Sequence, residues 1–360
     1  MSPRRPILAA LAALSLALAS PTAPAGAATS HVDGISDQSL SAWDGGFHES
    51  WFTGLFNDAW VHGPGAHIEF ARYVVQWNLM SGKYSRYLDE FEAWLEDVTS
   101  IGLKPEIGLT SFDGVLPGIP SEYQTELEDI LSRARALGHP IGWVEAWNEP
   151  NGQGGESAVE AADFTNEASE LCEEKEGCTV IAGDFEDSPN AGAYEEEYIN
   201  NLNPVPVNWG VHPYYSVERE SEAPYQKVRE HLPNKGEGEQ VWFTEVAARK
   251  CSDFDGDFVE NGEAGQAQRA SWLVHTLIRN AKPEHVFYYE VLLKERREPD
   301  CRTEGSDSAL YEPSADPAEP DRPRPAASYI WGDGGGAAPG EQGDAFMANA
   351  AQATLTGVYL

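Results

Sequence analysis

Two glutamates stand where short apolar runs of the sequence end. Glu149 follows the run 141–146 and precedes Pro150 and a glycine-rich stretch, while Glu245 closes the run 241–246. A carboxylate at the open end of a strand has little structural purpose. Two carboxyl groups that meet can cleave a glycosidic bond, one as acid and the other as base or nucleophile. The pattern therefore predicts this chemistry, provided that both strands end at the same edge of one fold.

Further polar and aromatic side chains lie near the ends of similar apolar runs: Arg72, Trp77, Asn148, His212 and Tyr214. Each has a plainer interpretation. Arg72 could be a simple ion-pair partner, His212 a buried core histidine, and Trp77 part of the core. Glu149 and Glu245 could likewise be structural carboxylates paired with arginines. The choice depends on the elements that position these residues.

From about residue 30 onward the chain alternates between apolar runs and amphipathic segments. Eight runs read as buried strands: 32–36, 70–77, 105–110, 141–147, 179–184, 207–212, 241–246 and 285–291. Helical spacing of apolar residues is clearest in 84–101, 123–137 and 270–281, and 326–331 could form a short final helix. This order predicts a single-domain α/β protein with a (β/α)8 TIM barrel. A doubly wound open sheet, the alternative, would need a glycine-rich phosphate loop that residues 33–38 do not provide.

A (β/α)8 barrel brings the C-terminal ends of its strands to one mouth, where catalytic residues lie. The fourth predicted strand ends in Asn-Glu-Pro, the sixth in His-x-Tyr and the seventh in Glu. In this order the motifs resemble clan A of the retaining glycoside hydrolases, a superfamily of barrels that includes cellulases, mannanases and β-xylosidases. The resemblance covers roughly residues 30 to 335, and its most specific motif is Trp-Asn-Glu-Pro-Asn at 147–151.

The resemblance implies a role for each matching residue. Glu149 would be the general acid/base and Glu245 the nucleophile. Asn148 would hydrogen-bond the sugar 2-hydroxyl, and Tyr214 would donate a hydrogen bond to Glu245. His212 would line the same site. Arg72 would keep the nucleophile ionised, and its match to the superfamily is looser than the others.

The end of the eighth predicted strand departs from the pattern of the superfamily, and the end of the third, at 109–113, lacks a histidine. Members of the superfamily commonly present a tryptophan at the end of the eighth strand, whereas this chain has Phe-Tyr-Tyr-Glu-Val at 287–291. Tyr288 or its neighbour Tyr289 would have to replace that sugar platform, with Trp77 as a further candidate for substrate binding.

We therefore expect a secreted retaining β-glycosidase that acts on a poly- or oligosaccharide without a cofactor or a metal ion. The first alternative is a catalytically inactive barrel that binds glycans. The second is a transglycosylase, which would use the same residues and differ in whether water or a sugar accepts the glycosyl group. The choice of sugar depends on the loops that follow the strands.

Charge narrows the range of partners. The 360 residues carry a formal net charge of −35, with a pI of about 4.4. Nucleic acids and anionic membranes would be repelled by such a surface, so neither is expected as a partner. A neutral carbohydrate is compatible with it, and the protein is expected to be a monomer.

The N-terminus has the pattern of a secretory signal peptide. Arg4 and Arg5 precede an apolar stretch at 7–19, and Ala-Gly-Ala at 25–27 provides a cleavage site. The apolar stretch is shorter than the ~20 residues that span a bilayer. We predict a signal peptide at 1–27, the catalytic barrel at 28–335 and a C-terminal segment of uncertain structure at 336–360.

Four cysteines in an exported chain indicate two disulfides, with three possible connectivities. We predict the pairs Cys172–Cys178 and Cys251–Cys301, because the first two are six positions apart and the others each follow a predicted strand. Zinc binding is the alternative, but the chain has no CxxC pair and no histidine cluster near the cysteines.

Overall fold

The computed structural model describes residues 32–36, 68–152, 156–188, 191–233, 240–254, 257–260, 262–290, 307–312 and 322–331. Several predictions fall outside these ranges: the signal peptide at 1–27, the C-terminal segment at 336–360, and Cys301 as the partner of Cys251. Within the described residues, no helix combines the length and the apolar character needed to cross a lipid bilayer.

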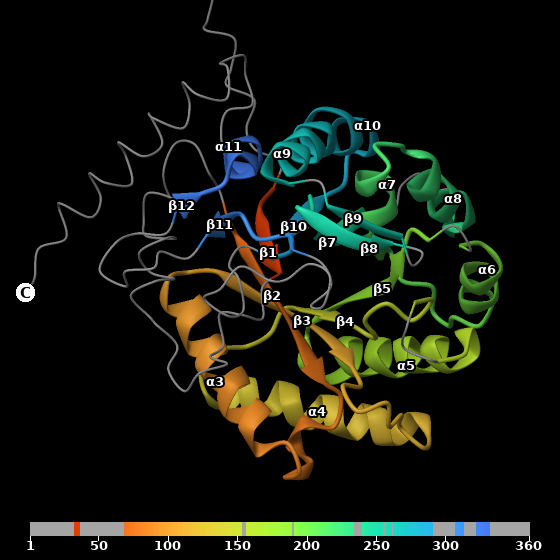
Figure 1. Cartoon of the computed structure of the whole chain (residues 1–360). Coiled ribbons are helices and arrows are strands. Elements are labelled where there is room, and N and C mark those ends of the chain that lie inside the picture. The colour runs from red at the N-terminus through yellow and green to blue at the C-terminus, as the bar shows by residue number, and fades with distance from the viewer. Residues whose placement is uncertain are drawn as a thin grey trace, which may run out of the picture.

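Eight parallel strands close into a barrel in the order β1-β10-β7-β6-β5-β4-β3-β2 (Figure 1). The strands are β1 (Gly34–Ser36), β2 (Phe70–Gln76), β3 (Lys104–Thr110), β4 (Trp143–Glu145), β5 (Thr179–Glu186), β6 (Asn208–His212), β7 (Gln240–Val246) and β10 (His285–Tyr288). Each predicted run contributes one strand, so the predicted (β/α)8 barrel is confirmed and the open sheet is wrong.

Helices surround the barrel (Figure 1). They are α3 (Ser85–Ser100), α4 (Pro120–Ala136), α5 (Ala158–Leu171), α6 (Ala193–Asn200), α7 (Tyr214–Glu218), α8 (Ala223–His231), α9 (Gly262–Trp272), α10 (Arg279–Ala281) and α11 (Pro325–Trp331), with short 3-10 or π segments η2 (Leu79–Ser81), η3 (Cys172–Glu176) and η5 (Leu273–Ile278). Their apolar stripes bury against the barrel, as Phe91, Trp94 and Leu95 of α3 do. At the start of α5, Ser157 and Glu160 form a capping box that satisfies free backbone N–H groups.

Two small antiparallel sheets accompany the barrel. The strands β8 (Cys251–Phe254) and β9 (Asp257–Glu260) pair directly after β7, and β11 (Tyr311–Glu312) pairs with β12 (Arg322–Pro323). Because β8 and β9 follow the C-terminal end of a barrel strand, they lie on the side where the strand ends gather.

Along its axis the barrel interior changes from apolar to charged. Phe70, Ile181, Trp242 and Phe287 form one buried cluster across four strands. Residues two positions along a strand share a face, so the layer above Phe70 is occupied by Arg72. The polar layer therefore lies toward the C-terminal ends of the strands, as a catalytic mouth requires.

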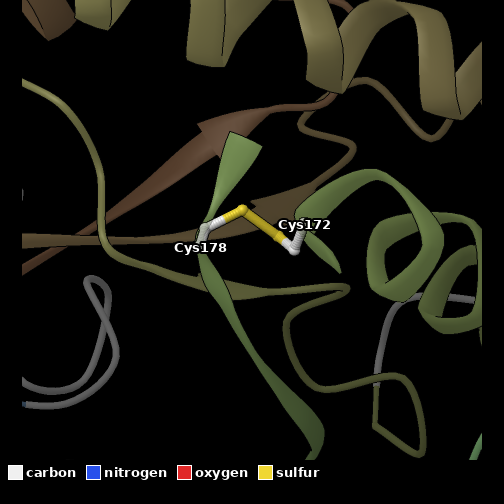
Figure 2. Close-up of a disulfide and its surroundings, with 2 residues drawn as sticks. All are labelled: Cys172 and Cys178. Carbon is white, nitrogen blue, oxygen red and sulfur yellow. A yellow bond between two sulfur atoms is a disulfide. The ribbon is translucent and has the colours of Figure 1, made fainter. Parts of the chain in front are cut away.

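The predicted disulfide between Cys172 and Cys178 is confirmed. Figure 2 shows it joining the end of the α5 segment to the chain that enters β5. Since Thr179 is the first residue of β5, this link lies at the N-terminal end of the barrel, away from the predicted mouth.

Candidate active site

Glu149 and Glu245 meet at the C-terminal end of the barrel. Each offers a carboxylate oxygen, and these two oxygens and a ring nitrogen of His212 lie within 4.8 Å of one another. This placement agrees with the prediction that the two glutamates share one site. Their side chains differ in surroundings, because Glu245 is buried whereas Glu149 is partly exposed.

Glu149 lies beyond its strand rather than in it. The run predicted as a strand over 141–147 pairs only at Trp143–Glu145, so Glu149 belongs to the turn that follows. Its φ of 48° is in the left-handed region, and its carbonyl oxygen accepts a hydrogen bond from Gly152 N at 2.9 Å. Its side-chain Oε1 is 2.8 Å from His212 Nδ1.

The carboxylate of Glu245 is surrounded by hydrogen-bond donors. Tyr214 donates its hydroxyl to Oε2 at 2.7 Å, and Arg72 donates from Nη1 to Oε1. His212 Nδ1 is 3.7 Å from Oε2. Burial alone would raise the pKa of Glu245, but the charges of His212 and Arg72 and the Tyr214 hydrogen bond outweigh it and hold the pKa below its usual value. This is the environment that a charged nucleophile needs.

Arg72 connects the strands of the barrel interior. It is fully buried, and it donates hydrogen bonds at 2.8–3.0 Å to Ser36 Oγ, Glu145, Asn148 Oδ1 and Asp184 Oδ2, as well as the bond to Glu245. Burial lowers the pKa of an arginine, but the surrounding carboxylates raise that of Arg72 above its usual range. Arg72 thus contacts Glu245 as predicted. It also forms ion pairs with Glu145 and Asp184, two carboxylates that the sequence did not point to.

His212 lies among three carboxylates. Its Nε2 forms an ion pair with Asp184 Oδ1 at 2.9 Å, without the alignment of a good hydrogen bond, and its Nδ1 faces Glu149. Burial lowers the pKa of His212, yet the charges of Asp184 and Glu245 raise it well above its usual value. A protonated imidazole therefore supplies a second positive charge to the site.

Asp184 reaches this position through an irregularity in β5. The register between β5 and β6 shifts between Gly183 and Phe185, and both Gly183 (φ 85°) and Asp184 (φ 54°) have left-handed backbone conformations. Such a bulge redirects a side chain, here toward His212 and Arg72. Although burial opposes it, these two cations lower the pKa of Asp184.

Two buried carboxyl groups, Glu106 on β3 and Glu145 on β4, lie behind Arg72. Burial is the main reason that the pKa of Glu145 rises to about 7 and that of Glu106 rises well above its usual range. Neither oxygen of Glu106 has a hydrogen-bond donor, which fits a protonated carboxyl that donates to Glu145. A Cβ on Gly108 would lie 2.5 Å from Glu145 Oε2 and 3.1 Å from Arg72 Nη2. The ion pair between Glu145 and Arg72 therefore fits only because position 108 has no side chain. The signal in the sequence was a single charged residue inside each of two otherwise apolar runs, 105–110 and 141–147.

The aromatic platform requires a correction. Tyr288 is 0% exposed and its hydroxyl donates to backbone carbonyl oxygens of Ala248 or Ser308, so it offers no ring face to a sugar. Trp77 is 5% exposed, and its indole N–H donates to Val115 O at 2.6 Å, so it packs as core. Tyr289 is partly exposed, and its ring centroid is 6.5 Å from that of Tyr214, which makes it the better candidate.

Among the described residues, Glu149, His212 and Glu245 are the group whose ligand atoms could converge on a metal ion. The charges around them disfavour a cation, because Arg72 and the His212 imidazolium already occupy the oxygens of Glu245 and Asp184. The donors suit a polar, uncharged substrate better.

Solved structures with similar folds include several enzymes that act on polysaccharides. An endo-β-1,6-glucanase superposes with a TM-score of 0.59 at 12% identity, over 85% of this chain and 76% of its own. A fungal β-1,4-galactanase gives 0.54 at 15% identity, over 78% and 95%. A family 30 subfamily 8 xylanase from Clostridium acetobutylicum gives 0.53 at 16% identity, over 82% and 69%. No family model and no curated protein matches the sequence. The resemblance inferred from the motifs is thus confirmed at the level of the fold.

Proposed function

We propose that the chain is a secreted retaining β-glycosidase, with Glu245 as nucleophile and Glu149 as general acid/base. The observation that carries the proposal is the approach of their carboxylate oxygens to within 4.8 Å, with Glu245 held as an anion. Retaining enzymes place the two carboxyl groups about 5–5.5 Å apart, whereas inverting enzymes need roughly 6.5–9.5 Å to admit a water molecule. The short approach favours retention.

The site can perform both steps of a double displacement. In the first, Glu245 attacks the anomeric carbon while a protonated Glu149 donates to the leaving oxygen. In the second, water attacks the anomeric carbon while Glu149 takes its proton, and the bond between the sugar and Glu245 breaks. Tyr214 and Arg72 would bind the nucleophile oxygens before attack, and Asn148, whose Oδ1 is fixed by Arg72, would be oriented toward the sugar.

The disulfide at Cys172–Cys178 is compatible with an exported protein. The bound ligand would be a poly- or oligosaccharide, but the fold does not select the sugar, because its structural neighbours act on glucans, galactans and xylans. Transglycosylation and inactive glycan binding remain the alternatives, and the ionised, donor-rich Glu245 favours an active site over the second.

Azide rescue tests the assignment. After a screen of chromogenic β-glycosides, the two alanine variants are assayed on the best aryl substrate. Glu245→Ala should lose hydrolysis, and azide entering its cavity should give the α-glycosyl azide. Glu149→Ala should still form the covalent intermediate from an activated aryl glycoside, and azide should attack it from the β face to give the β-glycosyl azide.

Glu96→Ala is the matched control, since Glu96 lies exposed on α3 far from the site in sequence and on the outside of the barrel. It should behave as the parent does. The reverse pattern of azide products would exchange the two roles. Wild-type rates in both site variants, or no activity on any glycoside, would favour the glycan-binding alternative.

A further inference from the structure

The turn that carries Glu149 is fastened to the rest of the barrel by the side chain of Asn151. Its Nδ2 donates to the backbone oxygen of Glu186 at 2.9 Å, and its Oδ1 accepts from the backbone N of Glu186 at 2.9 Å. Glu186 is the last residue of β5, so one amide group mimics a strand partner at the end of that strand. The same Nδ2 also donates to Glu195 Oε1 at 2.7 Å.

Glu195 makes this attachment costly to break. It is fully buried at the start of α6, and its second oxygen accepts from the backbone N of Gly192. If Asn151 moved away, one oxygen of a buried carboxyl group would lose its donor, and an unsatisfied buried acceptor is strongly unfavourable. The side chain of Asn151 is therefore held from β5 and from α6 together.

The other side of Glu149 is fixed as well. The backbone N of Asn148 donates to Leu109 O at 2.7 Å, which ties the chain to the end of β3. Between these two anchors Glu149 has a left-handed φ of 48°, and its carbonyl oxygen bonds to Gly152 N. A non-glycine residue keeps such a conformation when its surroundings impose it.

We propose that Asn151 is a positioning residue that sets the carboxyl group of Glu149 at its working distance from Glu245. The inference rests on the proposed glycosidase function and deepens it. Asn151 is engaged through both polar atoms of its amide, by Glu186 and Glu195. It acts through the turn 149–152, whose outer end it locks to Glu186 and Glu195.

The consequence is specific to one step of the reaction. A displaced acid delivers its proton poorly, and a displacement of about 1 Å can cost about 100-fold in rate. A phenyl β-glycoside needs that proton because phenolate is a poor leaving group. A 2,4-dinitrophenyl β-glycoside does not need it, because 2,4-dinitrophenolate leaves without being protonated. Asn151→Ala should therefore lower kcat/KM roughly 10- to 100-fold for the phenyl substrate and less than about threefold for the dinitrophenyl substrate.

The ratio of the two kcat/KM values separates positioning from folding. Loss of folded enzyme lowers both values equally, so the ratio does not report it. Ser157→Ala is the matched control, because it removes the N-cap of α5 a few residues further along the same segment. It should weaken the protein without changing the ratio. Glu195→Gln leaves one carbonyl oxygen for two donors, Asn151 Nδ2 and the backbone N of Gly192. It should change the ratio of the two kcat/KM values in the same direction as Asn151→Ala, to a smaller extent.

Glu149→Ala is measured beside these variants on the same phenyl and dinitrophenyl glycosides. If Glu149→Ala shows the leaving-group effect and Asn151→Ala lowers both substrates equally, the positioning role of Asn151 is wrong while the glycosidase assignment stands. If Glu149→Ala shows no leaving-group effect, the assignment of Glu149 as the acid is wrong. A change of ratio in both Glu149→Ala and Asn151→Ala supports the proposal.

Discussion

Glu106→Gln should make the protein more stable at neutral pH than its parent. Burial and the neighbouring Glu145 raise the pKa of Glu106 well above 4.5, so the folded protein keeps this proton after the unfolded chain has released it. The contribution of Glu106 to the free energy of unfolding is therefore most favourable below about pH 4.5. It falls as the pH rises toward the pKa of the folded protein, by about 1.4 kcal/mol per pH unit. Glutamine has no proton to lose, and its amide can still donate to Glu145.

As the pH rises above about 4.5, the free energy of unfolding of Glu106→Gln relative to the parent should increase, by at most about 1.4 kcal/mol per pH unit. Urea unfolding at a series of pH values measures this difference. Glu186 and Asp187, whose pKa values also rise to about 7 because they are buried, are present in both proteins and cancel. Glu145, whose pKa likewise rises to about 7, keeps a hydrogen-bond donor in the glutamine amide. Glu96→Gln on the exposed face of α3 controls for the loss of one carboxylate. A difference between Glu106→Gln and the parent that does not change with pH would refute a proton on Glu106.

Two further predictions concern the residues around Glu245. Tyr214→Phe removes the 2.7 Å hydrogen bond that helps to lower the pKa of Glu245, so the acid limb of kcat/KM should move to higher pH by about one unit; an unmoved limb would mean that Tyr214 does not stabilise the charged form. Gly108→Ala places a Cβ 2.5 Å from Glu145 Oε2 and 3.1 Å from Arg72 Nη2, and should lower the free energy of unfolding by about 2–4 kcal/mol and reduce activity; unchanged thermal unfolding would show that the ion pair can move aside.

The order of the strands and the meeting of Glu149 with Glu245 could be predicted because they depend on local patterns and one topological rule. Each apolar run is bounded by turn residues, and parallel strands of a closed barrel present their C-terminal ends together. Residue-level strand bounds were less predictable. The apolar run 141–147 continues past the paired residues of β4, since hydrophobicity reports burial rather than pairing.

The platform residue illustrates a second limit. Successive strand residues face opposite sides, so choosing between Tyr288 and Tyr289 requires the register of the eighth strand. That register shifts between Val286 and Tyr288 against β7, and a shift of this kind leaves no mark in the spacing of apolar residues. Only the folded chain therefore shows that the ring of Tyr288 is buried and that of Tyr289 is partly exposed.

The buried carboxyl groups were missed for a different reason: a charged residue within a strand usually signals an exposed face. Glu106 and Glu145 are instead fully buried, because Arg72 supplies charge and Glu106 supplies a proton. Their side chains find these partners across β2, β3 and β4, at separations that a single sequence does not reveal. The strand bulge that turns Asp184 inward is equally non-local.

The charge of the proposed nucleophile thus depends on how two cations are shared. Arg72 and His212 face five carboxyl groups, those of Glu106, Glu145, Glu149, Asp184 and Glu245. If all five were ionised, negative charge would exceed positive charge in the site, and each carboxylate would raise the pKa of the others. A proton held by Glu106 removes one competitor for Arg72 without removing a side chain that packs the barrel. The charge of Arg72 is then shared among Glu145, Asp184 and Glu245, and its share at Glu245, together with His212 and the Tyr214 hydrogen bond, lowers the pKa of the proposed nucleophile.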